Sequence, residues 1–419
     1  MEENLVKISF LGDIMCELPL LKASKIGRNE YNFDKVFANV TDIFKESDYI
    51  VGNLETICAG EELELTKHLF SFNTPESFIT SIKKSGIDMV TTATNHSLDR
   101  GIEGLIKNLD LLEKHQLKAI GTYRSLEERN EVFIEEFDDM KVAFLNYTYG
   151  TNAHINGVKL EEDERFHVNL MKPQDKELDK YYQKQKPKNM KQIVARYLFK
   201  IISLKTWISI KKRLGLQYYT AYQDNDLDDI DSTYLEQIRQ DIRKAKEKAD
   251  LVIMCMHSGG QFHPEPGQYS KYMMKFMNEN GVDIVVGNHP HVVQRFEVFN
   301  KGMFGAYSLG NFSISPSSVY VLPDNLPEYS IMLHAYLSKK EKKIDKMTFS
   351  ILKIVEFEDG SLTVYPVDEL IKELKSEQGR NKLKKDVTTI YNKFTGLNER
   401  IITIKREYAL TKGVNIGKS

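Results

Sequence analysis

The chain has 419 residues, 41% of them hydrophobic and 28% charged, which is enough to bury a sizeable core in one large domain or in two. Its formal net charge of −2 argues against nucleic acid as a partner. Three widely spaced cysteines are typical of reduced thiols and not of a disulfide framework. The start reads as a strand and no apolar run is long enough to span a bilayer, so we expect a cytoplasmic protein.

Strand-like and helix-like segments alternate along most of the chain. The predicted strands cover residues 6–13, 49–55, 87–96, 117–122, 141–148, 250–260 and 282–286. The predicted helices cover residues 75–86, 101–116, 233–249 and 268–281, and Thr233 with Glu236 fits a capping box. After Phe312 the pattern becomes mostly β, and the last fifty or so residues have a helical, polar pattern. This alternation predicts a largely parallel sheet covered by helices.

Five of these strands are followed directly by residues of the types that bind metals. They are Asp13, Glu55, Asn95 with His96, His257, and His289 with His291. Ligands of open α/β sheets bind at the carboxyl ends of the strands, so we expect these residues to share one pocket. Carboxylate, imidazole and amide together suit Zn, Mn or Fe(II), and the set is large enough for one ion or two.

The two histidines of "GNHPHVVQ" stand two residues apart with Pro290 between them. In an extended segment, residues two apart point to the same side. We therefore expect an extended backbone here, with His289 and His291 addressing two metals or two faces of one. For His257 alone, the alternative is an ordinary buried histidine, and for Asp13 it is turn chemistry after Gly12.

Six short motifs in order resemble the CapA family of capsule and poly-γ-glutamate synthesis proteins, a branch of the calcineurin-like metallophosphoesterases. They are "FLGDIM", "GNLE", "TNHSLDRGIEGL", "HSGGQFHPEPGQ", "GNHPHVVQ" and "YSLGNF". The resemblance implies a four-layer α-β-β-α sandwich with two central sheets, the second completed by the β-rich stretch Tyr329–Val367. We expect this domain at residues 1–367, with a basic helical insertion at about 155–225 and a helical C-terminal extension at 368–419.

The resemblance also implies roles for single residues. Its metal ligands are Asp13, Asn95, His257, His289, His291 and a bridging residue, which is Glu55 on charge grounds or Asn53 as the alternative. His96 matches the general acid. Asp99 is expected to orient the His96 imidazole, or alternatively to cap the following helix. Met15 stands where the wider superfamily has a histidine, and Ser258 and Gln261 replace the tryptophan and glutamate common in the family.

The implied activity is hydrolysis, in which metal-activated water attacks a phosphoester and His96 protonates the leaving group. Two other functions stay open at this point. One is a non-catalytic, metal-binding scaffold of an envelope-polymer machine; the other is metal-assisted cleavage of a γ-glutamyl or other amide bond. The expected ligand is a phosphorylated or polyanionic small molecule or polymer. For Asn311, in "YSLGNF", we expect a turn residue.

Residues 172–219 form a basic stretch, with 13 Lys or Arg against 3 acidic residues. An apolar pattern with interspersed cations and the only tryptophan is typical of a helix on an anionic membrane surface. Lys205 falls within the apolar stripe, which favours a packed helical insertion or an oligomer contact instead. The acidic stretch 224–231 lacks the central glycine and final glutamate of a calcium loop, and we expect it to cap the next helix.

Overall fold

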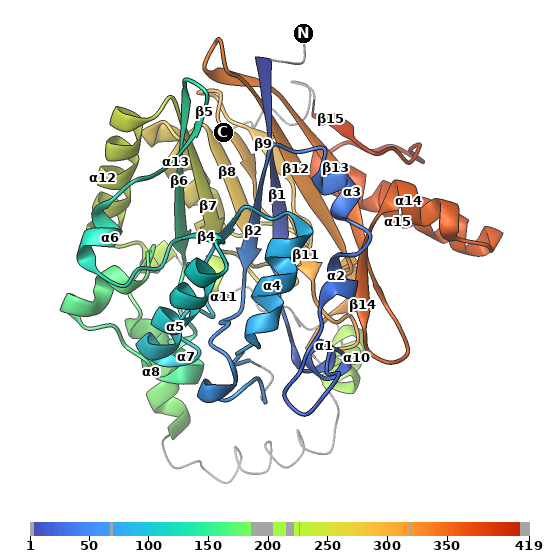
Figure 1. Ribbon diagram of the computed structural model, residues 1–419, viewed down its shortest axis with the longest axis horizontal. Helices are drawn as coiled ribbons and strands as arrows, with labels where there is room; N and C mark the ends of the chain where they lie inside the picture. The colour runs from blue at the N-terminus through green and yellow to red at the C-terminus, as the bar shows by residue number, and fades with distance from the viewer. Residues whose placement is uncertain are drawn as a thin grey trace.

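The computed structural model describes residues 4–67, 70–185, 204–214, 222–225, 227–318 and 320–410. Its first sheet has the order β14-β13-β12-β1-β2-β3-β4, with β11 beside β1 and β15 beside β13 (Figure 1). The strands are β1 (Leu5–Ile14), β2 (Tyr49–Leu54), β3 (Met89–Thr91), β4 (Lys118–Ile120), β11 (Asn311–Ser313), β12 (Tyr329–Ser338), β13 (Lys343–Glu356), β14 (Leu362–Pro366) and β15 (Tyr408–Leu410). β1 to β4 are parallel, whereas β12, β13 and β14 are antiparallel.

The second sheet has the order β5-β6-β7-β8-β10-β9. Its strands are β5 (Phe133–Phe137), β6 (Met140–Thr148), β7 (Leu251–His257), β8 (Ile284–Asn288), β9 (Phe296–Val298) and β10 (Phe304–Ala306). β6, β7, β8 and β10 run parallel, so their carboxyl ends lie at one edge of the sheet.

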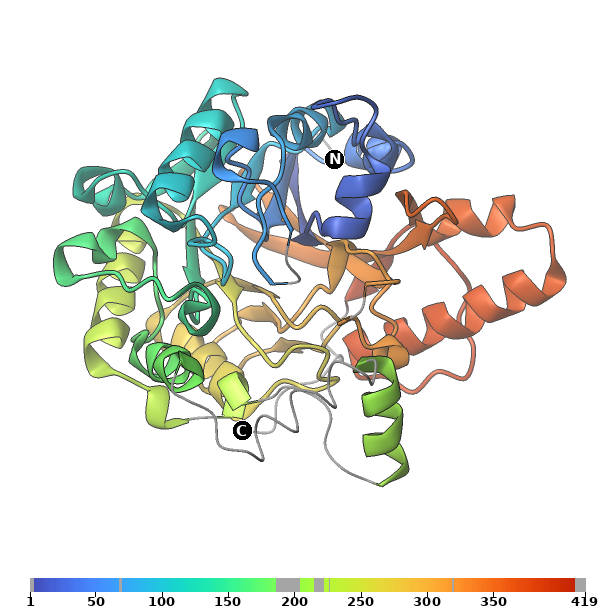
Figure 2. The ribbon, with the colours of Figure 1, turned by 90° about the horizontal axis from the view of Figure 1, so that it is seen from below.

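Helices cover the outer faces of both sheets (Figures 1 and 2). The described helices are α1 (Leu18–Ala23), α2 (Asp34–Phe37), α3 (Thr41–Phe44), α4 (Glu76–Ser85), α5 (Gly101–Lys114), α6 (Leu126–Asn130), α7 (Ala153–Asn156), α8 (Asp175–Gln185), α10 (Leu204–Arg213), α11 (Tyr222–Asn225), α12 (Ser232–Lys248), α13 (Gln268–Asn280), α14 (Val367–Glu373) and α15 (Glu377–Thr395). Within the described ranges, none of them combines the length and apolarity that crossing a bilayer requires.

Alternate side chains of the strands divide between an inner and an outer layer. Phe10 of β1 packs in the core between the sheets, and its neighbour Leu11 packs with residues of α1 to α4. Ile253 of β7 likewise faces the inner core, and Met254 packs against α12 and α13. The chain is therefore an α-β-β-α sandwich, and the predicted fold class is confirmed.

Three expectations need correction. The stretch 329–367 completes the sheet that contains β1 and not the second one, because β12 pairs with the edge of β1 that β2 leaves free. The strand predicted at 87–96 is only β3, and the rest forms the loop that carries Asn95 and His96. The capping box at Thr233 is wrong, because Asp231 caps α12 by accepting from the amides of Thr233 and Tyr234. The acidic stretch thus caps this helix as expected.

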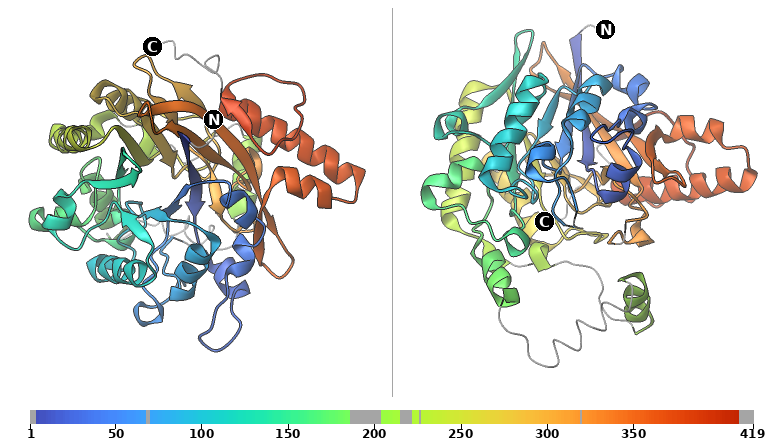
Figure 3. Two further views of the ribbon diagram at one scale, coloured as in Figure 1. Left: turned by 45° about the horizontal axis from the view of Figure 1, so that its top comes forward. Right: turned by 60° about the horizontal axis from the view of Figure 1, so that its bottom comes forward.

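The C-terminal helices project from one side of the sandwich (Figures 2 and 3). α15 nevertheless contributes Leu383, Val387, Ile390 and Phe394 to the inner core, and β15 pairs with β13. The extension is therefore packed on the domain. Of the basic stretch 172–219, the structure describes α8 and α10. The membrane contact predicted for this stretch falls in large part on residues 186–203 and 215–221, outside the described residues.

Candidate metal centre

The carboxyl ends of strands from both sheets meet at one buried site. Asp13 is the penultimate residue of β1 and His257 is the last residue of β7. The amide of Asp13 donates to the carbonyl of Gly310 at 2.9 Å. Gly12 makes this approach feasible, because a Cβ there would lie 2.0 Å from the same carbonyl oxygen. Gly12 of the motif "FLGDIM" therefore allows β11 to pack against Asp13.

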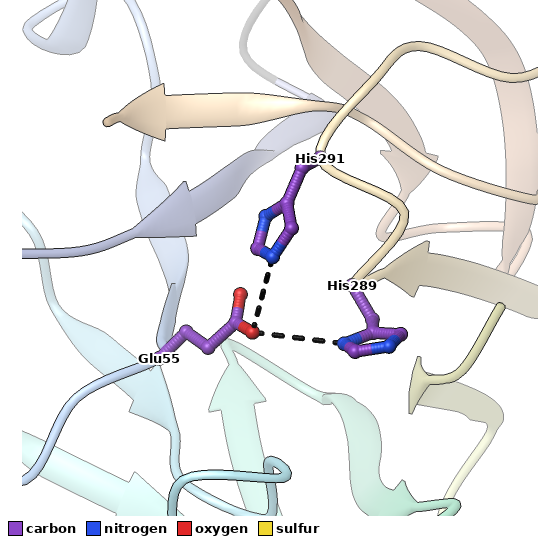
Figure 4. Close-up of side chains that lie close together, drawn as sticks. All are labelled: Glu55, His289 and His291. Carbon is purple, nitrogen blue, oxygen red and sulfur yellow. Dashed lines mark ion pairs between the residues drawn. The ribbon is translucent and has the colours of Figure 1, made fainter. Parts of the chain in front are cut away.

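Glu55, one residue after β2, occupies the centre of the site. Its Oε1 lies 3.4 Å from Nε2 of His257, 3.6 Å from Nδ1 of His289 and 3.6 Å from Nε2 of His291. Figure 4 shows the last two of these contacts converging on a single carboxylate oxygen. Two overlapping sets have ligand atoms within 4.8 Å of one another: Glu55 with His289 and His291, and Asp13 with Glu55 and His257.

The same residues leave polar atoms without hydrogen bonds. Both carboxylate oxygens of Glu55 and both ring nitrogens of His289 are buried and have no hydrogen-bond partner among the described residues. An unsatisfied buried polar group costs about 1–3 kcal/mol, so such a cluster needs a ligand to complete it. Carboxylate and imidazole atoms facing one point fit a divalent cation.

Electrostatics supports the same interpretation. Burial, followed by the nearby Asp13, raises the pKa of Glu55 well above its ordinary value. Burial, followed by neighbouring imidazoles, lowers the pKa of His257 and His289 well below theirs. All three shifts have the same first cause, which is that burial disfavours the charged form of each side chain. Neutral imidazoles are the form that binds metals, because the lone pair is free.

Asp13 and Asn53, from neighbouring strands, are hydrogen-bonded to each other in the site. The Asn53 amide donates to Oδ1 of Asp13 at 2.9 Å and lies 3.3 Å from Nδ1 of His257. Its oxygen accepts one hydrogen bond, from the hydroxyl of Thr91 at 2.8 Å. Asn53 thus contacts Asp13 and His257, whereas both sets of close ligand atoms contain Glu55.

The segment that carries the two paired histidines is not extended, contrary to expectation. His289 has a φ of 99° and His291 a φ of 58°, both in the left-handed region that non-glycine residues rarely adopt. Such conformations cost of the order of 1–3 kcal/mol each and persist where surrounding contacts fix them. The two imidazoles still converge on Glu55, but through a sharp turn and not through strand periodicity.

Contacts from three distant segments hold this turn. The amide of His289 lies 3.3 Å from both carboxylate oxygens of Asp13. The amide of Phe262 donates to the carbonyl of Pro290 at 2.7 Å, and the side chain of Asn311 donates to the carbonyl of His291 at 2.7 Å. These bonds explain how the strained backbone is maintained.

Asn311 is the residue whose role the sequence reasoning missed. It lies in β11 and not in a turn, so that expectation is wrong. Its Oδ1 lies 3.0 Å from Nδ1 of His291, which therefore donates, leaving Nε2 to face Glu55. Its position in the motif "YSLGNF" was the feature of the sequence that could have indicated a role at the site.

Asn95 and His96 enter the site from the loop after β3. Oδ1 of Asn95 lies 2.8 Å from Nε2 of His257. His96, the next residue, is also buried, and its Nδ1 lies 3.5 Å from the side-chain nitrogen of Asn152. All nine residues singled out from the sequence are thus buried and gathered at this end of the sandwich.

Asp99 orients His96. Its Oδ2 lies 2.6 Å from Nδ1 of His96 and also accepts the amide of Phe72 at 2.6 Å. The ring of Phe72 packs on the imidazole with centroids 4.4 Å apart. The alternative helix-cap role is wrong, because Arg100 is the N-cap residue of α5 and no side chain caps it.

Two of the described histidines without motif support have partners outside this cluster. His334 is buried between the hydroxyls of Ser9 and Ser350, as expected for a packing role. His115 pairs with Glu76 near the surface. His68 is outside the described residues.

Comparisons with known proteins agree with the motifs. The model of the family described as "Bacterial capsule synthesis protein PGA_cap" matches residues 7–316. The chain is similar to "Capsule biosynthesis protein CapA" of Bacillus anthracis, at 23% identity over 74% of this chain and 60% of that protein. It is also similar to "PGA biosynthesis protein CapA" of Bacillus subtilis (strain 168), at 23% identity over 74% of this chain and 63% of that protein. The chain thus spans only about 60% of the length of these curated relatives.

Two solved structures show distant likeness. A phosphatase of Mycoplasma pneumoniae aligns with a TM-score of 0.42 and 12% identity, over 83% of this chain and 93% of its own. A putative 5'-nucleotidase of Staphylococcus aureus aligns with a TM-score of 0.38 and 13% identity, over 90% of this chain and 57% of its own.

Proposed function

The chain belongs to the bacterial capsule synthesis protein family PGA_cap, and from this premise we propose that it is a metal-dependent hydrolase of phosphoester bonds. The observation that carries the proposal is the buried carboxylate of Glu55, unpartnered and faced by three imidazoles. A purely structural core would not keep such a group, because each unsatisfied atom destabilises the fold.

Two divalent ions, from among Mn, Zn and Fe, fit the donor set. The residues that would hold them are Glu55 with His289 and His291, and Asp13 with Glu55 and His257, so Glu55 would be shared by both sets. Asn95 would join beside His257. Asn53 would hold Asp13 in place through its amide. Such ions lower the pKa of a water molecule and polarise a phosphoryl group. The neutral state of His257 and His289 favours binding without prior loss of protons.

His96 is the proton donor of this proposal. Its Nδ1 is engaged by Oδ2 of Asp99, so Nε2 is the atom that carries the mobile proton. Asp99 would stabilise the imidazolium and fixes the ring, and Phe72 packs on the ring. Protonating a leaving oxygen in this way contributes about 10²–10⁴-fold to such reactions.

The first test is the metal itself. Elemental analysis of the purified protein, with anomalous scattering from crystals, should find one or two transition-metal ions between Glu55 and the three imidazoles. The metal-loaded protein should then hydrolyse aryl phosphodiesters. Metal in place but no turnover on phosphoesters with leaving groups of varied pKa would reject the phosphoesterase.

His96→Gln provides the sharper kinetic test. A general acid matters little for p-nitrophenol, which leaves readily, and greatly for phenol or an alkyl alcohol. The variant should therefore lose more activity as the pKa of the leaving group rises. His115→Gln is the matched control, since this histidine lies outside the site. A loss independent of the leaving group would remove His96 from this role.

The names of the relatives favour a second candidate, in which the substrate is an amide of a polyanionic polymer. The same donor set polarises amide carbonyls as readily as phosphoryl groups. Hydrolysis of γ-glutamyl oligomers by protein that spares phosphoesters would select it. Binding of such oligomers without cleavage of either bond would instead select a scaffold. For either polymer-linked role we propose a cytoplasmic location, at the membrane if residues 172–219 contact it.

A further inference from the structure

A loop of the second sheet reaches His96, which belongs to the first. Asn152 lies in the loop that follows β6, whereas His96 lies in the loop that follows β3. The side-chain nitrogen of Asn152 is 3.5 Å from Nδ1 of His96, the ring atom that Asp99 also contacts. Asn152 is only 4% exposed, so this contact is made inside the protein. Residues from both sheets therefore surround the proton donor of the proposed reaction.

Asn152 has an unfavourable backbone conformation. Its φ of 54° and ψ of 32° lie in the left-handed region. Asparagine visits this region more often than most residues, but the right-handed and extended regions remain lower in free energy. Residues in such conformations persist where their surroundings fix them, and they are common at functional sites. Contacts with other parts of the chain must therefore hold this residue in place.

One buried carboxylate holds the residues on both sides of Asn152. Oε2 of Glu177, in α8, accepts the amide of Ala153 at 3.0 Å and the amide of Thr151 at 3.4 Å. Gly150 leaves room for this carboxylate, because a Cβ there would lie 2.6 Å from Oε1 of Glu177. Burying a carboxylate is costly unless donors satisfy it, and here the donors are the amides of the turn. The position of Asn152 thus depends on Glu177.

The same loop is tied to the segment that carries His96. The side-chain amide of Asn156 donates to the carbonyl of Thr151 at 2.7 Å and to the carbonyl of Leu98 at 3.4 Å. Leu98 lies two residues after His96 in the chain. The turn at Asn152 and the His96 loop are therefore linked through backbone groups as well as through the contact of the two side chains.

We propose that Asn152 is a positioning residue for the proton donor His96, and that Glu177 holds Asn152 in place. This inference rests on the proposed phosphoesterase function and adds a residue to its machinery. Asp99 contacts Nδ1, Phe72 packs on the ring, and the amide of Asn152 restricts the imidazole from a further side. Nε2 thus keeps one direction for proton transfer. Precise placement matters, because a displacement of about 1 Å can cost about 10²-fold in rate.

The leaving-group dependence of Asn152→Gly tests this role. Glycine adopts a left-handed φ without strain, so the variant removes the side chain and keeps the turn. In the Mn²⁺-loaded protein, kcat for methyl phenyl phosphate should fall about tenfold, and kcat for methyl p-nitrophenyl phosphate by less than about twofold. The reason is that only the poorer leaving group needs the acid. KM and the dissociation constant for Mn²⁺, measured by calorimetry, should not change. If the glycine variant binds no Mn²⁺, Asn152→Ser takes its place.

Gln116→Gly is the matched control. Gln116 also carries a side-chain amide and has a left-handed φ of 55°, but it lies exposed after α5. Both esters should be hydrolysed by this variant at the wild-type rates. Loss of activity in Gln116→Gly would show that relaxing any left-handed residue slows the protein, and the effect at Asn152 would then not be evidence of positioning.

Two double variants separate positioning from a structural role. Asn152→Gly should cause no further loss in the His96→Gln background, because Asn152 acts through His96. Glu177→Ala should reproduce the tenfold loss on the phenyl ester, and its loss should not add to that of Asn152→Gly, because Glu177 acts through Asn152.

Each component of the inference can fail by itself. An unchanged rate in Asn152→Gly, an equal loss on both esters, or a further loss in the His96→Gln background rejects the positioning of His96 by Asn152. Additive losses reject Glu177 as the support of Asn152. If the Mn²⁺-loaded wild type cleaves neither ester, the proposed function itself fails, and the inference fails with it.

Discussion

Replacing Glu55 by glutamine should stabilise the metal-free protein and weaken its response to metal. Without an ion, both carboxylate oxygens of Glu55 are buried and lack hydrogen bonds, and the carboxylate of Asp13 lies close by. Burial and Asp13 together raise the pKa of Glu55, which means that its charged form destabilises the fold. The Glu55→Gln variant keeps the shape and removes the charge.

The size of the effect follows from these contacts. An unsatisfied buried group costs about 1–3 kcal/mol, and the cost is larger when the group is charged. Glutamine still leaves an amide unpartnered, so only the charge contribution is recovered. We expect the free energy of unfolding of the metal-free protein to rise by about 1–2 kcal/mol. In the wild type, metal at a thousand times its dissociation constant should add about 4 kcal/mol, and the variant should lose most of this.

Urea denaturation at pH 7.5, with chelator or with saturating Mn²⁺, measures both quantities. The matched control is Asp241→Asn, a buried carboxylate whose oxygens accept from Arg129, Tyr147 and Gln237. Its loss should destabilise the protein with and without metal, because Arg129 is left buried and unpaired. A Glu55→Gln variant that is less stable than the wild type in chelator would refute the account of Glu55 as an uncompensated ligand.

Three further outcomes are expected. Asp99→Asn should lower kcat by about 10²-fold with little change in KM in steady-state assays, because His96 loses the carboxylate that orients it. Burial raises the pKa of Glu17 to about 7, so the stability contributed by its protonated form is fully present below pH 4.5 and is lost as the pH rises to 7. In chelator, the free energy of unfolding of Glu17→Gln, measured by urea denaturation, should therefore rise relative to wild type by up to about 3 kcal/mol between pH 4.5 and pH 7. Despite a cost of burial, hydrogen bonds from Lys7 and other groups lower the pKa of half-buried Glu407 to about 2, so its contribution is present above pH 4.5 and lost towards pH 2. Glu407→Gln should cost about 1–2 kcal/mol at pH 7, after allowing for solvent screening, and nothing at pH 2.

The site could be located from the sequence because most of its residues lie at the ends of strands. Parallel strands place their carboxyl ends at a common edge, so Asp13, Glu55 and His257 could be grouped from the strand pattern alone. The layers themselves were expected from the family resemblance, and alternate residues of β1 and β7 face the inner and outer cores accordingly. Loop residues were placed less well, because Asn95 and His96 depend on where β3 ends, and it ends after three residues.

The choice between Glu55 and Asn53 could not be made from the sequence. Both lie at the end of β2, and either could reach a bridging position. In the fold, Oε1 of Glu55 lies within 3.6 Å of a ring nitrogen of each of three histidines, His257, His289 and His291. The Asn53 oxygen instead accepts from the hydroxyl of Thr91, 38 residues away in the chain. These contacts favour Glu55, as its charge does, and none of them is local in the sequence.

The turn at His289 and His291 shows why local pattern fails at such a site. Nothing in "GNHPHVVQ" favours a positive φ at a histidine. For an isolated segment, an extended conformation has the lower free energy. The structure nevertheless holds both residues there, through Asp13 from β1, Phe262 from the loop after β7 and Asn311 from β11. Each of these contacts comes from another part of the chain, so the strain can be maintained only in the folded domain. Asn311 also fixes the tautomer of His291, and the group that holds the backbone therefore also prepares the ligand.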